Sequence, residues 1–298
     1  MRRLSAFVVV SCLILAAVGA GAAQAAIPVG SPCSKSTPRN YTHVVVIAFE
    51  NHSYQTILGS SAPSSYFKTL AAHCGSATDF TAAHFPRSLP NYLAVTSGST
   101  AGISGDCTPS PGCSSPNRSI FQQVGRSQWR AWGESMPSAC DQQNSSLYVP
   151  RHLAAMYYTR VLKSTCLADA RPLPTPFPGV KRKFVWIAPN LVHDMHNGTP
   201  AQASAWLSNF LAGPRGLLRS RIYQTGHTAI FIWFDTSDAS GSITTPIPLI
   251  VIAPTVSHRT VTVHLNDYNL LHGWEGLLGL PCLSAACHVS GFDRRFNL

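Results

Sequence analysis

Four short apolar runs divide the chain, and each is rich in residues that favour β-strands. They occupy residues 44–48, 183–188, 229–234 and 248–253. A continuous apolar run of this length is typical of a strand buried on both faces, as in a parallel sheet. The gaps between the runs are long enough to hold helices. The pattern therefore predicts an α/β fold with a mainly parallel central sheet flanked by helices.

Polar side chains follow the first three runs. Glu50 and Asn51 end the first run, the segment PNLVHDMH follows the second, and Asp235 follows the third. Ligands of open α/β sheets bind outside the carboxyl ends of the strands, where the loops converge. We therefore expect these acids, amides and histidines to meet at one edge of the sheet.

Ser88 is the candidate nucleophile. It lies in a turn between Pro86 and Pro90, just before a helix-like stretch. A hydroxyl at a helix N-terminus lies beside backbone N–H groups and a positive dipole, which favour a bound anion and a lowered hydroxyl pKa. An ordinary helix-capping serine is the alternative interpretation. The chain has no GxSxG sequence, which argues against an α/β-hydrolase esterase.

The remaining polar residues suit metal ions and phosphate. Asp194 and His196 follow a strand within one short loop, and such a pair can ligate a hard or borderline divalent metal, although solvated loop histidines are common. Carboxylates, an amide and imidazole around one or two metals can bind a phosphate ester and activate Ser88. Arg87 could clamp the phosphate as a bidentate donor.

The N-terminus has the pattern of an export signal. Arg2 and Arg3 precede an apolar stretch that ends in small residues, which predicts a signal peptide over residues 1–25. A membrane anchor is the alternative. No later stretch is apolar and long enough to span a bilayer, so we expect a secreted protein with one domain over residues 26–298.

Cysteine usage agrees with export. The chain has nine cysteines, and removing Cys12 with the signal leaves an even number, which indicates disulfides. Close spacing favours pairing of Cys107 with Cys113 and of Cys282 with Cys287. Further pairs, with connectivity left open by the sequence, are Cys140 with Cys166 and Cys33 with Cys74. The absence of a CxxC spacing argues against redox catalysis and structural zinc.

Charge and loop composition add to this picture. The net charge of +10 becomes +8 when the two signal arginines are removed, and it favours anionic partners. No lysine-rich tract or basic stripe interleaved with aromatics is evident, so a nucleic-acid-binding module is not expected. Residues 100–180 are rich in Pro, Ser, Cys and Gly and are expected to form disulfide-pinned loops over the site.

Five motifs occur in a fixed order over about residues 42–282. They are ENHS from Glu50, PRSLPNY from Pro86, PN at Pro189 with Asp194 and His196, Asp235, and YNLLHGWEGLLGLP from Tyr268. In this order they resemble the bacterial phosphoesterases that include secreted acid phosphatases and phospholipases C, within the alkaline phosphatase superfamily. The segments at Glu134 and at Arg151-His152 look most like the small secreted acid phosphatases, some of which act on phosphatidylinositol 3-phosphate.

The resemblance implies an alkaline-phosphatase-like fold and a phosphoseryl mechanism with Ser88 as nucleophile. It implies a divalent metal, and a phosphorylated small molecule or a phosphoinositide headgroup as substrate. Asp194 and His196 would serve a second metal or the leaving group. The full set of expected site residues is Ser88 as the catalytic residue, Glu50, Asn51, Asp235, Asp194, His196 and Asp267 as metal ligands, and Arg87 and Asn91 as substrate-binding residues.

Four positions depart from the family pattern. Thr236 replaces an acid, Asp267 a histidine, and Pro86-Arg87 a His-Pro pair, while Ser204 or one of its neighbours replaces an aspartate expected shortly before Trp206. Asp267 can still ligate a metal, and Asp238 can substitute for the missing acid. We expect a secreted metal-dependent phosphomonoesterase. A phospholipase C-like diesterase and a catalytically weak protein that binds phosphorylated ligands are the alternatives.

Overall fold

The computed structural model describes residues 32–33 and 40–298. The predicted signal peptide lies outside these residues and stays a prediction. Among the described residues, none of the helices has the length and apolar character needed to cross a bilayer.

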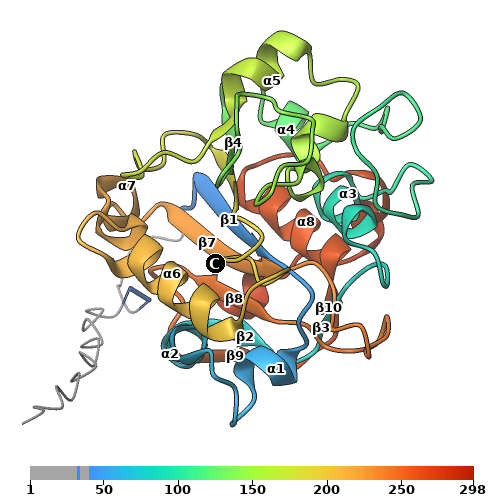
Figure 1. The fold of residues 1–298 in the computed structure, drawn as a ribbon. Coiled ribbons are helices and arrows are strands. Elements are labelled where there is room, and N and C mark those ends of the chain that lie inside the picture. The colour runs from blue at the N-terminus through green and yellow to red at the C-terminus, as the bar shows by residue number, and fades with distance from the viewer. Residues whose placement is uncertain (1–31, 34–39) are drawn as a thin grey trace, which may run out of the picture.

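A central eight-stranded sheet organises the molecule (Figure 1). All neighbouring strands are parallel except β8, which runs antiparallel to both of its neighbours. The four predicted runs are β1, β6, β7 and β8, so the predicted fold class is confirmed. The strands, in spatial order, are β5 (Ala170–Pro172), β4 (Trp129–Gly133), β6 (Phe184–Ala188), β1 (His43–Phe49), β7 (Thr228–Phe234), β8 (Leu249–Ile252), β2 (Gly75–Ala77) and β9 (Arg259–Val261).

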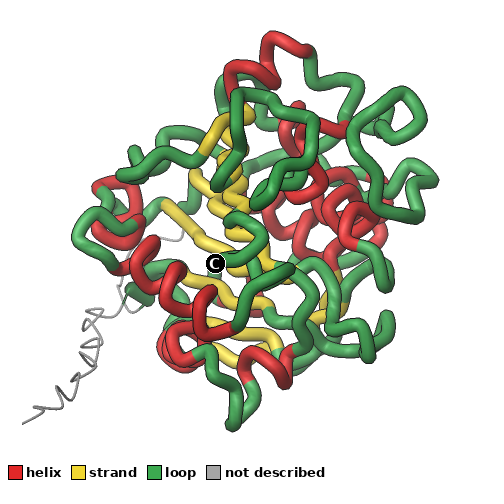
Figure 2. Tube along the Cα trace, viewed as in Figure 1, coloured by secondary structure: helices red, strands yellow, loops and turns green. Residues whose placement is uncertain are grey.

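Helices cover both faces of the sheet, which explains why its strands lack polar alternation. On one face Phe49 packs against Phe67 of α2 (Ser65–His73) and Trp206 of α6 (Pro200–Ala212). On the other face Trp233 packs against Tyr92 of α3 (Ser88–Ser97). Trp274 of α8 (Asp267–Leu277) packs there too, against Phe231. In Figure 2 the yellow strands lie between red helices.

The other elements are short. A two-stranded sheet pairs β3 (Phe80–Thr81) with β10 (Leu265–Asn266). The remaining α-helices are α1 (Tyr54–Leu58), α4 (Ile120–Gln123), α5 (Lys163–Asp169), α7 (Arg221–Gln224) and α9 (Asp293–Phe296), and the 3-10 helices are Pro150–His152, Ala154–Tyr157, Leu217–Arg219 and Ser284–His288.

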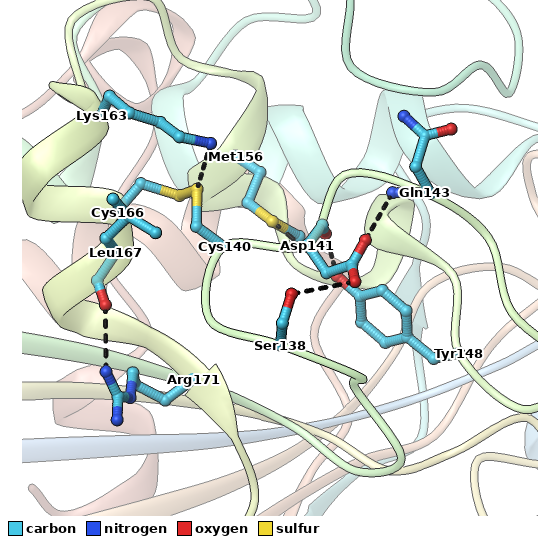
Figure 3. Close-up of a disulfide and its surroundings, with 10 residues drawn as sticks. All are labelled: Ser138, Cys140, Asp141, Gln143, Tyr148, Met156, Lys163, Cys166, Leu167 and Arg171. Carbon is cyan, nitrogen blue, oxygen red and sulfur yellow. Dashed lines mark hydrogen bonds between the residues drawn. A yellow bond between two sulfur atoms is a disulfide. The ribbon is translucent and has the colours of Figure 1, made fainter.

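Disulfides pin the loops, and all four predicted pairs are confirmed. Figure 3 shows the bond that joins Cys140 to Cys166 of α5. Next to it, the Tyr148 hydroxyl donates a hydrogen bond to the main-chain carbonyl of Asp141 (2.6 Å). This network holds the chain directly before the 3-10 helix Pro150–His152, which brings His152 to the site.

Candidate active site

The carboxyl ends of β1 and β7 bring two acids together. Phe49 pairs with Phe234 in the sheet register, so Glu50 and Asp235 leave neighbouring strands at the same level. The Glu50 N–H donates a hydrogen bond to the main-chain carbonyl of Asp194 (2.9 Å), which holds the loop after β6 close to the end of β1. The Asn51 N–H donates to Oδ1 of Asp235 (2.9 Å). The three polar groups therefore meet at one sheet edge, as predicted from the sequence.

Helix α3 presents two hydroxyl groups to Glu50. Ser88 is the first residue of the helix and Arg87 holds the capping position, so the capping interpretation of Ser88 is wrong. Ser88 Oγ donates to Oε2 of Glu50 (2.9 Å), and one turn later the Tyr92 hydroxyl donates to Oε1 (2.6 Å). Side chains four residues apart lie on one helix face, which explains the shared acceptor.

His152 completes the buried cluster. Its ring stacks on Tyr92, with centroids 5.5 Å apart and planes 6° apart. Nε2 lies 3.0 Å from Oε1 of Glu50, and Nδ1 lies 3.0 Å from Oδ2 of Asp194. We did not predict this residue as part of the site. Its only signal in the sequence was the Arg151-His152 pair within the family resemblance.

Burial of several acids perturbs their pKa values. Burial, followed by repulsion from Asp235 and Asp194, raises the pKa of Glu50 well above its ordinary value. Burial also raises the pKa of Asp194 to about 7. Burial raises the pKa of Asp235 too, although hydrogen bonds that include one from Ser88 offset part of the effect. Burial lowers the pKa of His152 well below its ordinary value. A bound cation would favour the ionised forms of these acids and so oppose the upward shifts of their pKa values.

Unpartnered oxygens make the cluster suitable for a metal ion. Oδ2 of Asp235 and Oγ1 of Thr236 are buried and make no hydrogen bond within the described chain. In residues 32–33 and 40–298, no three His, Cys, Asp or Glu side chains form a ready-made metal-ligand group. The donor chemistry fits a hard divalent cation, because Glu50 and Asp235 together supply carboxylate oxygens and two negative charges.

Two expected residues use their polar atoms inside the protein. Asn91 is buried, accepts from the His84 N–H, and donates to the carbonyls of His84 and Arg87, so it shapes the loop before Ser88. The Asp267 carboxylate accepts from Trp233 Nε1 and from a main-chain N–H (both 2.8 Å). Burial raises the pKa of Asp267 to about 8.

Other candidates lie at the rim or outside the cluster. His196 is exposed, and its Nε2 lies 3.0 Å from the guanidinium of Arg151. Arg87 is exposed beside Ser88. Asp238 lies outside the cluster, because its two oxygens accept hydrogen bonds from His52, Ser53 and Thr56. It therefore does not substitute for the acid missing at position 236.

Comparisons with solved structures identify the fold. A protein of the alkaline phosphatase superfamily from Vibrio parahaemolyticus matches with a TM-score of 0.53 at 10% identity, over 86% of this chain and 72% of that one. The lipoteichoic acid synthase LtaP of Listeria monocytogenes also has a TM-score of 0.53, at 8% identity, over 82% of this chain and 73% of that one. The chain therefore has the alkaline phosphatase superfamily fold.

One named relative is similar in sequence. A phosphatidylinositol-3-phosphatase of Mycobacterium tuberculosis is 28% identical over 244 residues, which cover 81% of this chain and 78% of the relative. No family model matches the chain. The resemblance to bacterial phosphoesterases is confirmed, and so is the predicted class of enzyme, a hydrolase of phosphoric ester bonds.

Proposed function

We propose that the chain is a secreted, metal-dependent phosphomonoesterase with Ser88 as its nucleophile. The observation that carries the proposal is the hydrogen bond from Ser88 Oγ to the buried Glu50, beside Asp235, at the N-terminus of α3. The four disulfides support export, because such bonds persist in oxidising compartments.

The N-terminus of α3 is suited to oxyanions. The Leu89 N–H already donates to a carboxylate oxygen of Asp106 (2.9 Å). A phosphoryl group presents the same kind of oxygen, and N–H groups and the dipole at a helix start attract it. Arg87 and Arg151 supply positive charge at the rim. These groups would hold the phosphate of a substrate against Ser88.

The chemistry then proceeds in two displacements. Ser88 Oγ attacks phosphorus and loses its proton, while the ester P–O bond breaks and the alcohol leaves with a proton. Water next attacks the phosphoserine, which releases phosphate and restores the hydroxyl. Glu50, Asn51 and Asp235 would hold a divalent metal that lowers the pKa of the hydroxyl and neutralises developing charge. Tyr92 keeps Glu50 in place throughout.

The substrate class follows from the site and the relative. A phosphate monoester suits a rim that carries arginines, and the relative's name adds the headgroup of a 3-phosphorylated inositol lipid as a candidate. A phospholipase C-like diesterase remains the second candidate of this fold. The departure at Thr236 keeps open the third candidate, a weak enzyme that binds phosphorylated ligands.

Phosphate release from p-nitrophenyl phosphate tests the proposal. Signal-free, oxidised protein should be active between acid and neutral pH, and a chelator or Ser88→Ala should abolish the activity. Ser65→Ala is the matched control, because Ser65 also begins a helix but lies on the distant α2. Full activity of Ser88→Ala would refute the mechanism. Faster release from bis-p-nitrophenyl phosphate would favour the diesterase, and an inactive wild type that still binds phosphate would favour the binding protein.

A further inference from the structure

The segment LPTPFPGVKRK, residues 173–183, changes from apolar to basic within a few residues. It connects β5 to β6 at one edge of the central sheet, between β4 and α7 in Figure 1. Two adjacent cavities share this segment. One, of about 440 Å³, is lined by its apolar half, and the other, of about 280 Å³, by its basic half.

The larger cavity is an aromatic groove. Trp206 and Phe210 of α6 stack with centroids 4.9 Å apart and planes 5° apart. Phe177 of the loop lies 5.0 Å from Phe210 and is only partly buried. Pro174 and Pro176 also line this groove. Partly exposed aromatic and proline side chains of this kind suit the boundary between water and the acyl region of a lipid bilayer.

The smaller cavity is cationic. It is lined by Arg130, Lys181 and Arg182, and none of its lining residues is acidic. The Arg130 guanidinium lies 5.0 Å above the Trp132 ring. Asp169, which is 2% exposed, lies 3.6 Å from the guanidinium of Arg130. One buried carboxylate leaves the pocket with an excess of positive charge toward solvent.

Glu134 joins the groove to the active site. It lines the groove and accepts a hydrogen bond from Trp206 Nε1 (3.1 Å). Its other oxygen lies 2.8 Å from Nδ1 of His193, which immediately precedes Asp194. The groove therefore borders the loop that supplies Asp194 to the site.

We propose that residues 173–183, with the aromatic face of α6, dock onto an anionic lipid surface. The aromatic groove enters the interface, while Arg130, Lys181 and Arg182 contact headgroup phosphates. A soluble acidic protein would satisfy the cations but leave the adjoining aromatic groove without an apolar partner. Docking would present lipid-borne phosphate esters to Ser88, and this role rests on the proposed function. Binding to the lipid surface itself does not depend on the proposed function.

Vesicle sedimentation tests this surface in full-length oxidised protein. The probes are vesicles of phosphatidylcholine alone and vesicles that also contain phosphatidylserine. Lys181→Glu reverses one charge in the cationic pocket. Arg294→Glu is the matched control, because Arg294 is exposed in the arginine-lined cavity beside β9, at the opposite edge of the sheet. Phe177→Ala tests the aromatic groove separately.

The wild type should bind the anionic vesicles in a salt-sensitive way and the neutral vesicles weakly. Lys181→Glu should weaken partitioning about thirtyfold, because each unit charge near an anionic bilayer contributes roughly a factor of five. Phe177→Ala should weaken it severalfold, and Arg294→Glu much less than Lys181→Glu. All three variants should keep wild-type activity on p-nitrophenyl phosphate, which shows that they fold.

Three results would overturn the docking proposal: no binding of the wild type to anionic vesicles, an equal loss in Arg294→Glu and Lys181→Glu, or capture of a soluble acidic polypeptide with vesicle binding absent. Ser88→Ala separates the two proposals. This variant should still bind vesicles, so loss of the proposed catalysis and loss of docking are distinguishable.

Discussion

Glu275 of α8 provides a quantitative test of how burial controls stability in this protein. The residue is 1% exposed, and hydrogen bonds from Gln123 and from the Leu283 main chain offset only part of the cost of burying its carboxylate. Burial raises its pKa from 4.5 to about 8. The native state therefore holds a proton that the unfolded state releases between these pH values, and stability falls as pH rises through this window. Glu275→Gln removes the titration.

The magnitude follows from the shift in pKa. At pH 7, which is 2.5 pH units above the unfolded-state pKa of 4.5, the unfolded state has released the proton and the native state still holds it. The free energy of unfolding is therefore lower than at acid pH by about 3.4 kcal/mol, at 1.36 kcal/mol per unit. The adjoining loop 278–284 is partly exposed, so solvent screening lowers our expectation to about 2 kcal/mol.

Urea unfolding at pH 5 and pH 8, with chelator present, measures this difference. The free energy of unfolding of Glu275→Gln minus that of the wild type should grow by about 2 kcal/mol between the two pH values. Other buried acids titrate in both proteins and cancel in the difference. A difference in the free energy of unfolding between Glu275→Gln and the wild type that is the same at both pH values would refute the reasoning.

Three further perturbations probe the site and its support. Tyr92→Phe removes the 2.6 Å hydrogen bond to Glu50. Turnover of p-nitrophenyl phosphate should fall about ten- to hundredfold, because a hydrogen bond to a charged group contributes about 1.5–3 kcal/mol. Unchanged turnover would contradict this role of Tyr92. Thr236→Asp should tighten binding of a divalent metal, measured by calorimetry, and should weaken inhibition by phosphate, because it adds a negative charge to the site. No change in either quantity would place residue 236 outside the metal's reach. Replacing Cys140 and Cys166 by Ser opens a loop with a sequence separation of 26. Thermal unfolding should show a loss of stability of about 3 kcal/mol. An unchanged melting temperature would show that packing alone holds this loop.

Local sequence pattern was sufficient to predict the sheet and the convergence of its polar strand ends at the candidate site. The runs that became β1, β6 and β7 are apolar because both faces of the sheet are covered, and parallel strands bring their carboxyl ends to one edge. Glu50, Asp194 and Asp235 therefore had to converge. The antiparallel direction of β8 had no such signal, because an apolar run of this kind reads the same in either direction.

Contacts between distant loops were harder to predict. His152 comes from a short 3-10 helix whose position depends on packing against Tyr92 and on the disulfide-pinned segment before it. Asp238 follows Asp235 closely in the sequence, yet it turns away to hold the start of α1. The basic residues 181–183 form only a short cluster in the sequence, and Arg130 joins them through the pairing of β4 with β6.

Under the proposed function, the charge balance of the site accounts for a threonine at position 236. Glu50 and Asp235 carry two negative charges when ionised, which equal the charge of one divalent ion. An additional acid at position 236 would bind the metal more tightly but leave a net negative charge facing the phosphate. Thr236 instead offers a neutral hydroxyl, buried and without a hydrogen-bond partner in the described chain, beside Asp235. Under the proposed function, this departure from the family pattern would exchange metal affinity for a weaker repulsion of an anionic substrate.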